Sequence, residues 1–379
     1  MTQHRLPAVW MRGGTSKGLF LHAEDLPADP NERDALLLRA LGSPDPYGSQ
    51  MDGVGGGTSS TSKVVLISRS QRRGCDVDYH FGHIAVEQPL VDWSGNCGNL
   101  TAAVGPFALE EGLVEPREPT TTVRIWQANL GERILAHVPV EGGAPAVDGD
   151  VAMAGVPGYG AGIRLDFLGA PEPRPVLPTS RPRDTLRIPG LGSLEASLVH
   201  AGNPTVFIRA SDVGLKSTEQ PGDIDDPTLL EALEAIRCAG AVAMGLADAP
   251  ATVRRTRPAT PKVAFVAPPC PMRDSAGQTH TADTLDVVGR ILSMGRLHHA
   301  FTGTGAIALA VAARIPGTVV NAAARPRAGS IRLGHTAGRL EVDAAVTCRG
   351  GQWYADRVSV VRTARRLMEG AVLVKVRKT

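Results

Sequence analysis

The chain has 379 residues, 42% of them hydrophobic and 21% charged, which is the composition of an ordinary soluble globular protein. Forty basic and 38 acidic residues leave a formal net charge of +2, which gives no reason to expect a nucleic-acid or membrane partner. Five widely spaced cysteines form no CxxC pair and no apolar run reaches about 18 residues, so the sequence predicts a protein of the reducing cytoplasm without disulfides.

The first half is predicted to consist mostly of short strands, since 43 glycines and 29 prolines favour turns. A strand–loop–strand unit over residues 8–22 precedes a helix over 31–41 that ends at Gly42. A glycine-rich loop, "DGVGGGTSSTSK", then leads into a β-branched run at 64–68. A helix over 98–112 interrupts the remaining predicted strands, which are 76–81, 83–88, 121–129, 133–140, 151–154 and 163–166.

A proline-rich segment, residues 169–183, is predicted to cross to a second half with the same order of elements. Its helices are expected over 227–245 and 304–314. The predicted strands are 193–200, the adjoining "AGNPTVFIRA", 262–267, 330–333, 339–346, 353–361 and 371–376.

Two apolar helices hold matching places in the halves, "GNCGNLTAAVGPFAL" and "FTGTGAIALAVAARI". Both are too apolar to lie on a surface, so each is expected to be wrapped by its own sheet. This order suggests an internal duplication with a cleft between the halves, although the two sequences differ too much to establish a repeat.

Cys97 stands in "DWSGNCGNL", at the predicted start of the first apolar helix. Free N–H groups and the positive end of the helix dipole would favour a thiolate there. A buried, inert thiol explains the spacing equally well, because free cysteine is among the most buried residue types. The other four cysteines lack this framing and are predicted to be core residues.

Several polar loops could bind an anion. Lys63 follows a donor-rich loop that lacks the GK[ST] ending of a P-loop, which excludes nucleotide binding and leaves a carboxylate site or a flexible loop. "MRGGTSKG", residues 11–18, adds cationic and hydroxyl groups between strands. "HAGNPT" around Asn203 reads as a turn, and His335 could bind a carboxylate. The basic runs 69–73 and 362–366 are expected to be solvated.

Metal and serine-hydrolase chemistry find no support in the sequence. His298 and His299 are adjacent, so in a helix or strand their side chains would point apart, and no HExxH spacing accompanies them. No G-x-S-x-G elbow occurs.

Long motifs spread over essentially the whole chain resemble the methylaconitate isomerase (PrpF) family, which is associated with propionate catabolism. They are "MRGGTSKG", "GSPDPYGSQMDGVGGGTSSTSK", "DWSGNCGNLTAAVGPFALEEGLV", "AGNPT" and "HHAFTGTGAIALAVAARIPGTVVN". This resemblance implies an α+β fold of the diaminopimelate epimerase type, with two pseudo-symmetric halves, each a sheet rolled around a central helix. The halves would be residues 1–185, completed by a C-terminal strand at 366–379, and residues 186–365, with the active site between them.

The resemblance also implies catalysis without a cofactor or metal. In the epimerase relatives two cysteines face each other, each at the start of a central helix. Cys97 matches the first, but Thr302 stands at the second and cannot serve as a thiolate base. The resemblance supplies a lysine instead, which matches Lys63. We therefore expect Lys63 and Cys97 to form the acid/base pair.

The expected substrate is an unsaturated tricarboxylate of the 2-methylaconitate or aconitate type. Removing an allylic proton would spread charge onto carboxylate oxygens, so hydrogen-bond donors should converge on the site. The predicted substrate-binding residues are Arg12, Thr15, Ser16, Lys17, Ser62, Asn96, Gly98, Asn99, Asn203, Thr302, Gly303, Thr304 and His335.

Other functions stay open at this point. A 4-oxalomesaconate tautomerase would use a keto–enol shift in the same site. An amino-acid epimerase fits less well because Thr302 replaces the second thiol, and a non-catalytic tricarboxylate-binding protein would need no thiol. The only partner that the sequence suggests is the small-molecule substrate, and a homodimer is a candidate assembly.

Overall fold

The computed structural model describes residues 3–326 and 328–375, and contacts within the chain group it into two units. Unit 1 comprises Met1–Val151, Tyr159–Leu165 and Arg362–Thr379, and unit 2 comprises Ala152–Gly158 and Asp166–Val361. The sequence-based division at residue 185 differs, because 166–185 group with the second unit. One reason is that the backbone of Val176 bonds to that of Trp353 and His200. The last four residues of the predicted C-terminal strand 366–379 lie outside the described residues.

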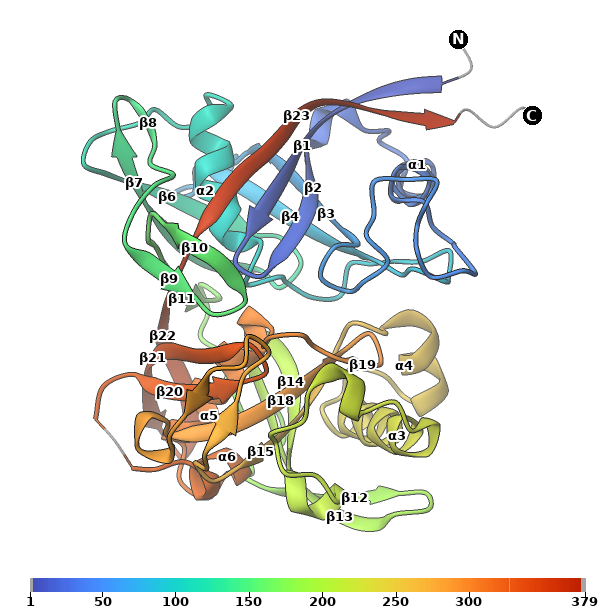
Figure 1. Cartoon of the computed structure of the whole chain (residues 1–379), viewed down its shortest axis with the longest axis vertical. Coiled ribbons are helices and arrows are strands. Elements are labelled where there is room, and N and C mark those ends of the chain that lie inside the picture. Colours follow the sequence, from blue (N-terminus) through green and yellow to red (C-terminus); the bar gives the residue numbers. More distant parts are fainter. Residues whose placement is uncertain (1–2, 327, 376–379) are drawn as a thin grey trace. The chain divides into compact units, whose positions relative to one another are not determined.

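Unit 1 is a strand layer with one helix on each side. In the order of their pairing the strands are β23 (Ala364–Lys375), β1 (Gln3–Gly13), β2 (Ser16–His22), β3 (Lys63–Arg69), β4 (Val77–Ile84), β6 (Thr120–Gln127) and β7 (Glu132–Glu141). Short strands β5 (Val91–Asp92) and β8 (Ala144–Pro145) pair with β4 and β7. Figure 1 shows β23 lying along β1, although one ends the described chain and the other begins it.

The two helices of unit 1 differ in burial. Helix α1 (Pro30–Leu41) is amphipathic and packs Leu36 and Leu37 against Val64 and Leu66 of β3. By strand alternation Lys63 and the odd-numbered residues of β3 point to the other face. Every residue of α2 (Thr101–Glu110) is buried except the last, so this helix lies inside the unit, with α1 and α2 on different sides of β1–β4 (Figure 1).

Unit 2 repeats the arrangement. In pairing order its strands are β12 (Asp184–Ile188), β13 (Gly192–Ala201), β14 (Asn203–Arg209), β15 (Lys262–Ala267), β18 (Val287–Ser293), β20 (Ile331–His335), β21 (Gly338–Arg349) and β22 (Gln352–Arg362). Helix α3 (Pro227–Ala243) covers one face, followed by α4 (Pro250–Thr256). Helix α5 (Gly303–Arg314) is buried from Gly303 to Ala313, and α6 (Val319–Ala323) packs beside it.

Smaller elements complete the chain. They are β9 (Val151–Met153), β10 (Val156–Gly160), β11 (Ile163–Gly169), β16 (Met272–Arg273), β17 (Thr279–His280), β19 (Arg296–Leu297), η1 (Ala23–Asp25), η2 (Ala210–Val213), η3 (Pro221–Asp223) and η4 (Ala282–Thr284).

The strand pairings follow the same sequence of directions in both units. From β23 through β7, and again from β12 through β21, they are antiparallel, antiparallel, parallel, antiparallel, parallel and antiparallel. Helix α1 falls between the parallel strands β2 and β3, as α3 falls between the parallel strands β14 and β15. Helices α2 and α5 precede β6 and β20. The predicted pair of pseudo-symmetric halves, each with a central helix, is confirmed.

Most predicted elements are confirmed, with corrections at their ends. Helix α1 begins after Asp29, whose carboxylate accepts from two backbone N–H groups, and ends at Gly42 with φ 82°. The strands predicted at 76–81 and 83–88 are one strand, β4, because β3 pairs with it without interruption through Gly82. The predicted helix 98–112 starts only at Thr101. Helices α4 and α6 were not predicted, and the predicted strand 371–376 ends one residue beyond the described chain.

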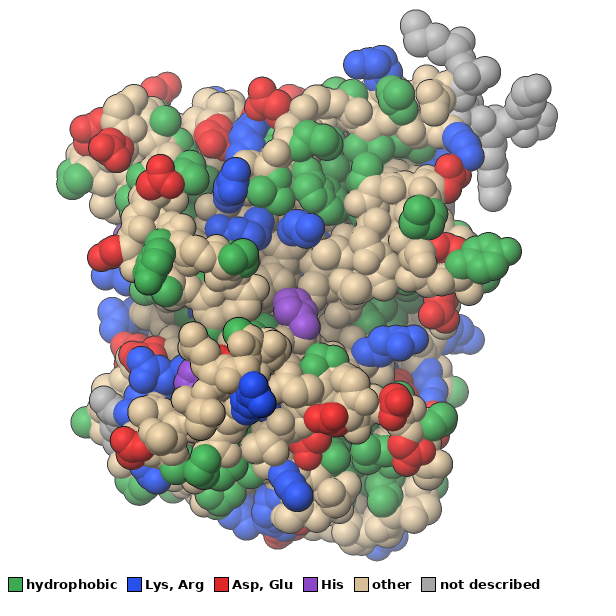
Figure 2. Space-filling model, in the orientation of Figure 1, with side chains coloured by type: hydrophobic (Ala, Val, Ile, Leu, Met, Phe, Trp, Pro, Cys, Tyr) green, Lys and Arg blue, Asp and Glu red, His purple; other side chains and the backbone are tan. Residues whose placement is uncertain are grey.

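Side chains of both charge signs lie on the face seen in Figure 2. Within residues 3–326 and 328–375, the helices are all too short or too polar to cross a membrane.

Candidate active site

Lys63, Ser16 and Cys97 lie together in unit 1. The Lys63 ammonium donates to Ser16 Oγ at 2.9 Å and lies 3.4 Å from Cys97 Sγ. The sulfur is 4.0 Å from the same hydroxyl. All three side chains are buried, with Lys63 6% and Cys97 7% exposed. Because the nitrogen and the sulfur are only 3.4 Å apart, one small molecule bound beside them can exchange protons with both.

Strand register brings Lys63 to Ser16. Each begins its strand, and β2 and β3 run parallel with Leu19 opposite Val64, so the two starts are neighbours. The β-branched run after Lys63 forms the buried strand, while the hydroxyl-rich loop before it supplies no regular structure.

Cys97 lies in the turn between β5 and α2. The backbone N–H of Leu100 points at the sulfur, at 3.4 Å, and Thr101 N–H bonds to the Cys97 carbonyl at 2.9 Å. The hydroxyls of Thr101 and Tyr79 donate to that carbonyl as well. Although α2 starts later than predicted, its N-cap residue Leu100 still directs a backbone N–H to the thiol. A backbone donor at the helix start was the reason for singling out this cysteine.

Asn99 connects three chain segments. Its amide nitrogen donates to Thr15 Oγ1 at 3.0 Å, and its oxygen accepts from Arg362 Nε at 3.3 Å. A Cβ on Gly14, where φ is 53°, would lie 2.5 Å from the Asn99 oxygen, so the close approach requires glycine. The hairpin turn of β1 and β2 is thereby held against the Cys97 turn.

Arg362 was missed by the sequence reasoning, which took residues 362–366 for a solvated run. The side chain is only 4% exposed and reaches Asn99 from the end of β22, and burial lowers the pKa of Arg362 to about 10. No sequence signal distinguishes it from Arg365, which is exposed. Only the pairing of β23 with β1 brings this arginine to the turn.

Arg12 holds the backbone of the same turn. Its Nη1 donates to the carbonyls of Gly14 and Thr363 and to Thr363 Oγ1, at 3.2, 2.9 and 3.0 Å. Burial, and then the charge of Arg365, lowers the pKa of Arg12. Substrate binding by Arg12 stays a prediction.

The other predicted residues of unit 1 are placed differently. Ser62 donates to the Ile84 carbonyl at 2.9 Å and accepts from Gln50 at 2.7 Å, contacts typical of a structural residue. Lys17 is exposed and follows Ser16 in β2, so it points to the opposite face of the strand. Asn96 and Gly98 are buried on either side of Cys97.

The predicted residues of unit 2 gather around α5 and two strand ends. Thr302 caps α5, its Oγ1 accepting from Gly305 N–H at 3.2 Å, and the buried Gly303 and Thr304 begin the helix. Asn203 starts β14, and His335 ends β20 with Nδ1 accepting from Ala337 N–H. Their roles in binding stay predictions.

The remaining cysteines are set apart from this chemistry. Burial, and then Glu234, raises the pKa of Cys238 to about 11, and burial also raises the pKa of Cys75 and of Cys270. Cys348 is exposed on β21. Among the residues that the structure describes, no three His, Cys, Asp or Glu side chains are grouped closely enough to hold a metal ion.

A family model described as "PrpF protein" matches residues 3–375. The chain belongs to the PrpF family. Relatives of this PrpF chain include 2-methyl-aconitate isomerase of Shewanella oneidensis, 46% identical over 98% of this chain and 97% of that one. The 3-methylitaconate isomerase of Eubacterium barkeri is 41% identical over 99% of both chains. The (4E)-oxalomesaconate Delta-isomerase of a Novosphingobium species is 37% identical over 97% of both.

Solved structures agree with this membership. A methylitaconate-delta-isomerase has 40% identity and a TM-score of 0.77, over 99% of this PrpF chain and 97% of that one. A probable proline racemase from Agrobacterium radiobacter, with 15% identity, has a TM-score of 0.56 over 98% and 93% of the two chains. The second likeness concerns the fold alone, which is the predicted epimerase-like α+β fold.

Proposed function

We propose that this PrpF chain is an isomerase that moves or rotates the C=C bond of an unsaturated polycarboxylate, with Lys63 and Cys97 as its acid/base pair. The observation that carries the proposal is the 3.4 Å approach of Lys63 Nζ to Cys97 Sγ, with Ser16 holding the ammonium. Two groups that can each hold a proton are what a reaction needs when it removes a proton at one carbon and returns one at another.

The chemistry proceeds through a delocalised anion. One member of the pair removes an allylic C–H proton next to a carboxylate, and the electron pair of that bond spreads over the dienolate. The other member returns a proton to the far carbon of the allylic system or, after rotation about a bond, to the original carbon. The Leu100 N–H near the sulfur and the Asn99 amide beside Thr15 supply neutral donors close to this charge.

A 2-methylaconitate or aconitate-type tricarboxylate is the substrate that we favour. The relative from Shewanella oneidensis supports this choice, since it is named for 2-methyl-aconitate and matches over nearly the whole chain. The place of the reaction would then be propionate catabolism. A 4-oxalomesaconate isomerase is the second candidate, supported by the Novosphingobium relative.

Single substitutions test the acid/base pair. Cys97→Ser and Lys63→Met should each lower kcat for the favoured substrate by at least about 100-fold, the usual contribution of a positioned acid or base. Circular dichroism should show both variants folded. Full activity in either variant would contradict the assignment.

Proton exchange separates catalysis from binding. The wild-type chain mixed with aconitate in D₂O should incorporate deuterium at the allylic carbon, whereas a non-catalytic binding protein would leave it protonated. Assays of 2-methyl-trans-aconitate, trans-aconitate and 4-oxalomesaconate side by side then rank the substrates by kcat/KM.

The thiol of Cys97 bears on the cellular compartment that we propose for the protein. Cys97 must stay reduced to exchange protons, and all five cysteines are free, which supports a cytoplasmic location. A homodimer is the assembly that we propose to test by light scattering.

A further inference from the structure

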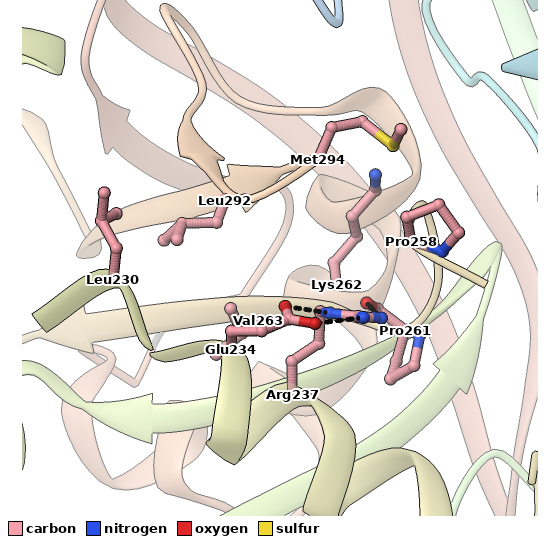
Figure 3. Close-up of a pocket in the computed structure, with 10 residues that line it drawn as sticks. Leu230, Glu234, Arg237, Pro258, Pro261, Lys262, Val263, Leu292 and Met294 are labelled. Carbon is pink, nitrogen blue, oxygen red and sulfur yellow. Dashed lines mark hydrogen bonds and ion pairs between the residues drawn. The ribbon is translucent and has the colours of Figure 1, made fainter. Parts of the chain in front are cut away.

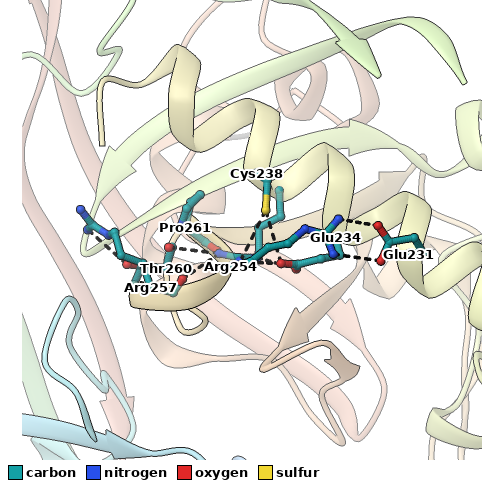
Figure 4. Close-up of polar contacts among 8 residues, drawn as sticks. Glu231, Glu234, Cys238, Arg254, Arg257, Thr260 and Pro261 are labelled. Carbon is teal, nitrogen blue, oxygen red and sulfur yellow. Dashed lines mark hydrogen bonds and ion pairs between the residues drawn. The ribbon is translucent and has the colours of Figure 1, made fainter. Parts of the chain in front are cut away.

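The described part of the chain buries three arginine side chains, Arg237, Arg290 and Arg362. In unit 2, Arg237 of α3 pairs with the Glu234 carboxylate on the wall of a small pocket (Figure 3), and its Nη1 donates to main-chain carbonyls of the loop before β15 (Figure 4). Arg290 of β18 also donates to main-chain carbonyls. These two arginines hold backbone segments in place, whereas Arg362, which belongs to unit 1, donates to the side chain of Asn99.

The chemistry of arginine fixes the orientation of the Asn99 amide. A guanidinium has N–H donors and no acceptor, so the atom of Asn99 that faces Arg362 Nε must be the amide oxygen. The amide nitrogen then faces Thr15 Oγ1, at 3.0 Å, and donates to it. Thr15 is the acceptor in this contact, and its own O–H is therefore left to donate in another direction.

The Thr15 hydroxyl is placed where a ligand can reach it. Thr15 lies in the turn between β1 and β2 and is half-buried, and within residues 3–326 and 328–375 no acceptor takes its hydrogen. Ser16 has the same polarity, because the Lys63 ammonium, which is also a donor without acceptors, donates to Ser16 Oγ. Two successive hydroxyl groups are thus set as donors, one of them in contact with the proposed acid/base pair.

Backbone contacts keep Arg362 close to this turn. The Gly14 N–H donates to the Thr363 carbonyl at 2.9 Å, and Arg12 donates to the same carbonyl and to the Thr363 hydroxyl. The two segments are therefore joined directly, and the Asn99 side chain closes a ring of hydrogen bonds between them. A buried network of this kind holds its members in defined orientations.

We propose that Arg362 is a positioning residue which, by orienting the Asn99 amide, makes the Thr15 hydroxyl a hydrogen-bond donor to a carboxylate of the substrate. The inference rests on the proposed function, which supplies the ligand class. A hydroxyl that donates to a carboxylate forms a charge-assisted hydrogen bond, and accepting from the amide at the same time polarises that hydroxyl further. With the amide reversed, Thr15 would donate to Asn99, and the substrate would meet an oxygen lone pair instead of a donor.

Asn99→Asp reverses the hydrogen bond to Thr15 and keeps the contact with Arg362. Beside the guanidinium the new carboxylate stays ionised and can only accept, so the Thr15 hydroxyl must donate to it. Calorimetry with propane-1,2,3-tricarboxylate should show a Kd on the order of 10- to 100-fold above the wild-type value, the loss expected for one hydrogen bond to a charged group. Circular dichroism should show the variant folded.

Thr15→Val separates the loss of the donor from the negative charge that Asn99→Asp adds. Alone, Thr15→Val should raise Kd by a similar factor, whereas Thr15→Ser, which keeps the hydroxyl, should bind within about twofold of wild type. Added to Asn99→Asp, Thr15→Val should change Kd by less than about threefold, because the donor is already lost. Repulsion by the added charge would instead make the two factors multiply.

Arg362→Met tests what orients the amide. It should raise Kd about 10-fold or more, and Arg362→Lys, which also offers donors and no acceptor, should recover part of the binding. Arg5→Met, which removes an exposed arginine of the same unit, should bind as the wild type does. If Arg362→Met does not fold, the double substitution at Asn99 and Thr15 decides.

Other outcomes overturn the inference. A Kd for Thr15→Val within about twofold of wild type would show that its hydroxyl does not bind the ligand, and factors that multiply in the double variant would show that Asn99 does not act through Thr15. A wild type that binds no tricarboxylate contradicts the inference together with its ligand class. If the wild type binds the tricarboxylate but isomerises none of the substrates, the proposed function fails, while the binding data still decide the role of Arg362.

Discussion

At the scale of single residues, Ser62 and Lys63 are adjacent in the chain, but their side chains have different roles. Ser62 is turned into the core, where its hydroxyl joins Ile84 and Gln50, and Lys63 is turned toward Ser16 and the thiol. The sequence alone placed both in one binding loop. Ser62 is the loop residue before β3 and Lys63 is the first residue of that strand. Which face of β3 would hold the site depends on where α2 packs, and no local pattern reveals that.

Removing the Ser62 hydroxyl should therefore change stability and leave catalysis alone. Ser62→Ala leaves the Gln50 amide and the Ile84 carbonyl with one hydrogen bond fewer in a buried place, so we expect a loss of about 1–3 kcal/mol in the free energy of unfolding. Urea denaturation measures that loss, and kcat should stay within about twofold of wild type. A large fall in kcat at unchanged stability would return Ser62 to the binding site.

Ser16→Ala, unlike Ser62→Ala, should lower the rate of catalysis. Without the 2.9 Å contact, the Lys63 ammonium is no longer held beside Cys97, and we expect kcat to fall on the order of 10- to 100-fold. The variant should also unfold more easily, because the buried ammonium loses a hydrogen-bond partner, so circular dichroism must show it folded at the assay temperature. Ser16→Thr, which restores a hydroxyl, should recover part of the activity, and unchanged kcat in Ser16→Ala would argue against a positioning role.

At the scale of elements, the central helices were the most predictable part of the fold. An apolar, glycine-containing run such as that of α5 fits a helix surrounded by protein on all sides. The start of α2 was less predictable, because Gly98 and Asn99 are compatible with a turn or a helix, and the turn is decided by the contacts of Asn99 with Thr15 and Arg362. Helices α4 and α6 are only 7 and 5 residues long, too short to show a helical period.

Packing around α2 makes Gly105 a sensitive position. A Cβ there would lie 2.5 Å from a methyl group of Val138 and 3.2 Å from the Ala136 Cβ on β7. Gly105→Ala should lower the free energy of unfolding by about 1–3 kcal/mol through overpacking, although alanine is the better helix former. Thermal melts test this, with Gly222→Ala, where the added methyl group meets open space, as the control. An equal or higher melting temperature for Gly105→Ala would contradict the packing argument.

At the scale of the whole molecule, the duplication was suggested by the order of elements but could not be established from sequence. The equivalence of Lys63 and Lys262, the first residues of β3 and β15, is carried by the direction and register of strand pairing, and the segments around the two lysines share few residues. The repeat is therefore recognised from the directions and register of the paired strands, and not from similar side chains at matching positions.

Each unit also contains a histidine that makes folding depend on pH. Burial, and then the charge of Arg33, lowers the pKa of His80 to about 4, and burial with Arg174 and Arg257 does the same for His200. As the pH falls from about 6.5 toward 4, the unfolded chain gains these protons and the folded chain does not. Stability should be complete above that window and fall by roughly 1–3 kcal/mol per histidine within it.

Denaturation at pH 7.5 and 5 measures this effect. His80→Gln should reduce the difference in unfolding free energy between the two values, whereas substitution of the exposed His4 by Gln should leave it unchanged. An undiminished difference in His80→Gln would show that other groups cause the acid sensitivity.

The pairing of β1 with β23 has a consequence for synthesis. Val9 lies opposite Glu369, so β1 leaves the ribosome roughly 360 residues before its neighbour exists. At about 5–20 residues per second, that edge of unit 1 waits without a partner strand for some tens of seconds. During this interval the nascent chain presents an open strand edge to other polypeptides, so translation speed and chaperone supply become part of what decides the yield of folded enzyme.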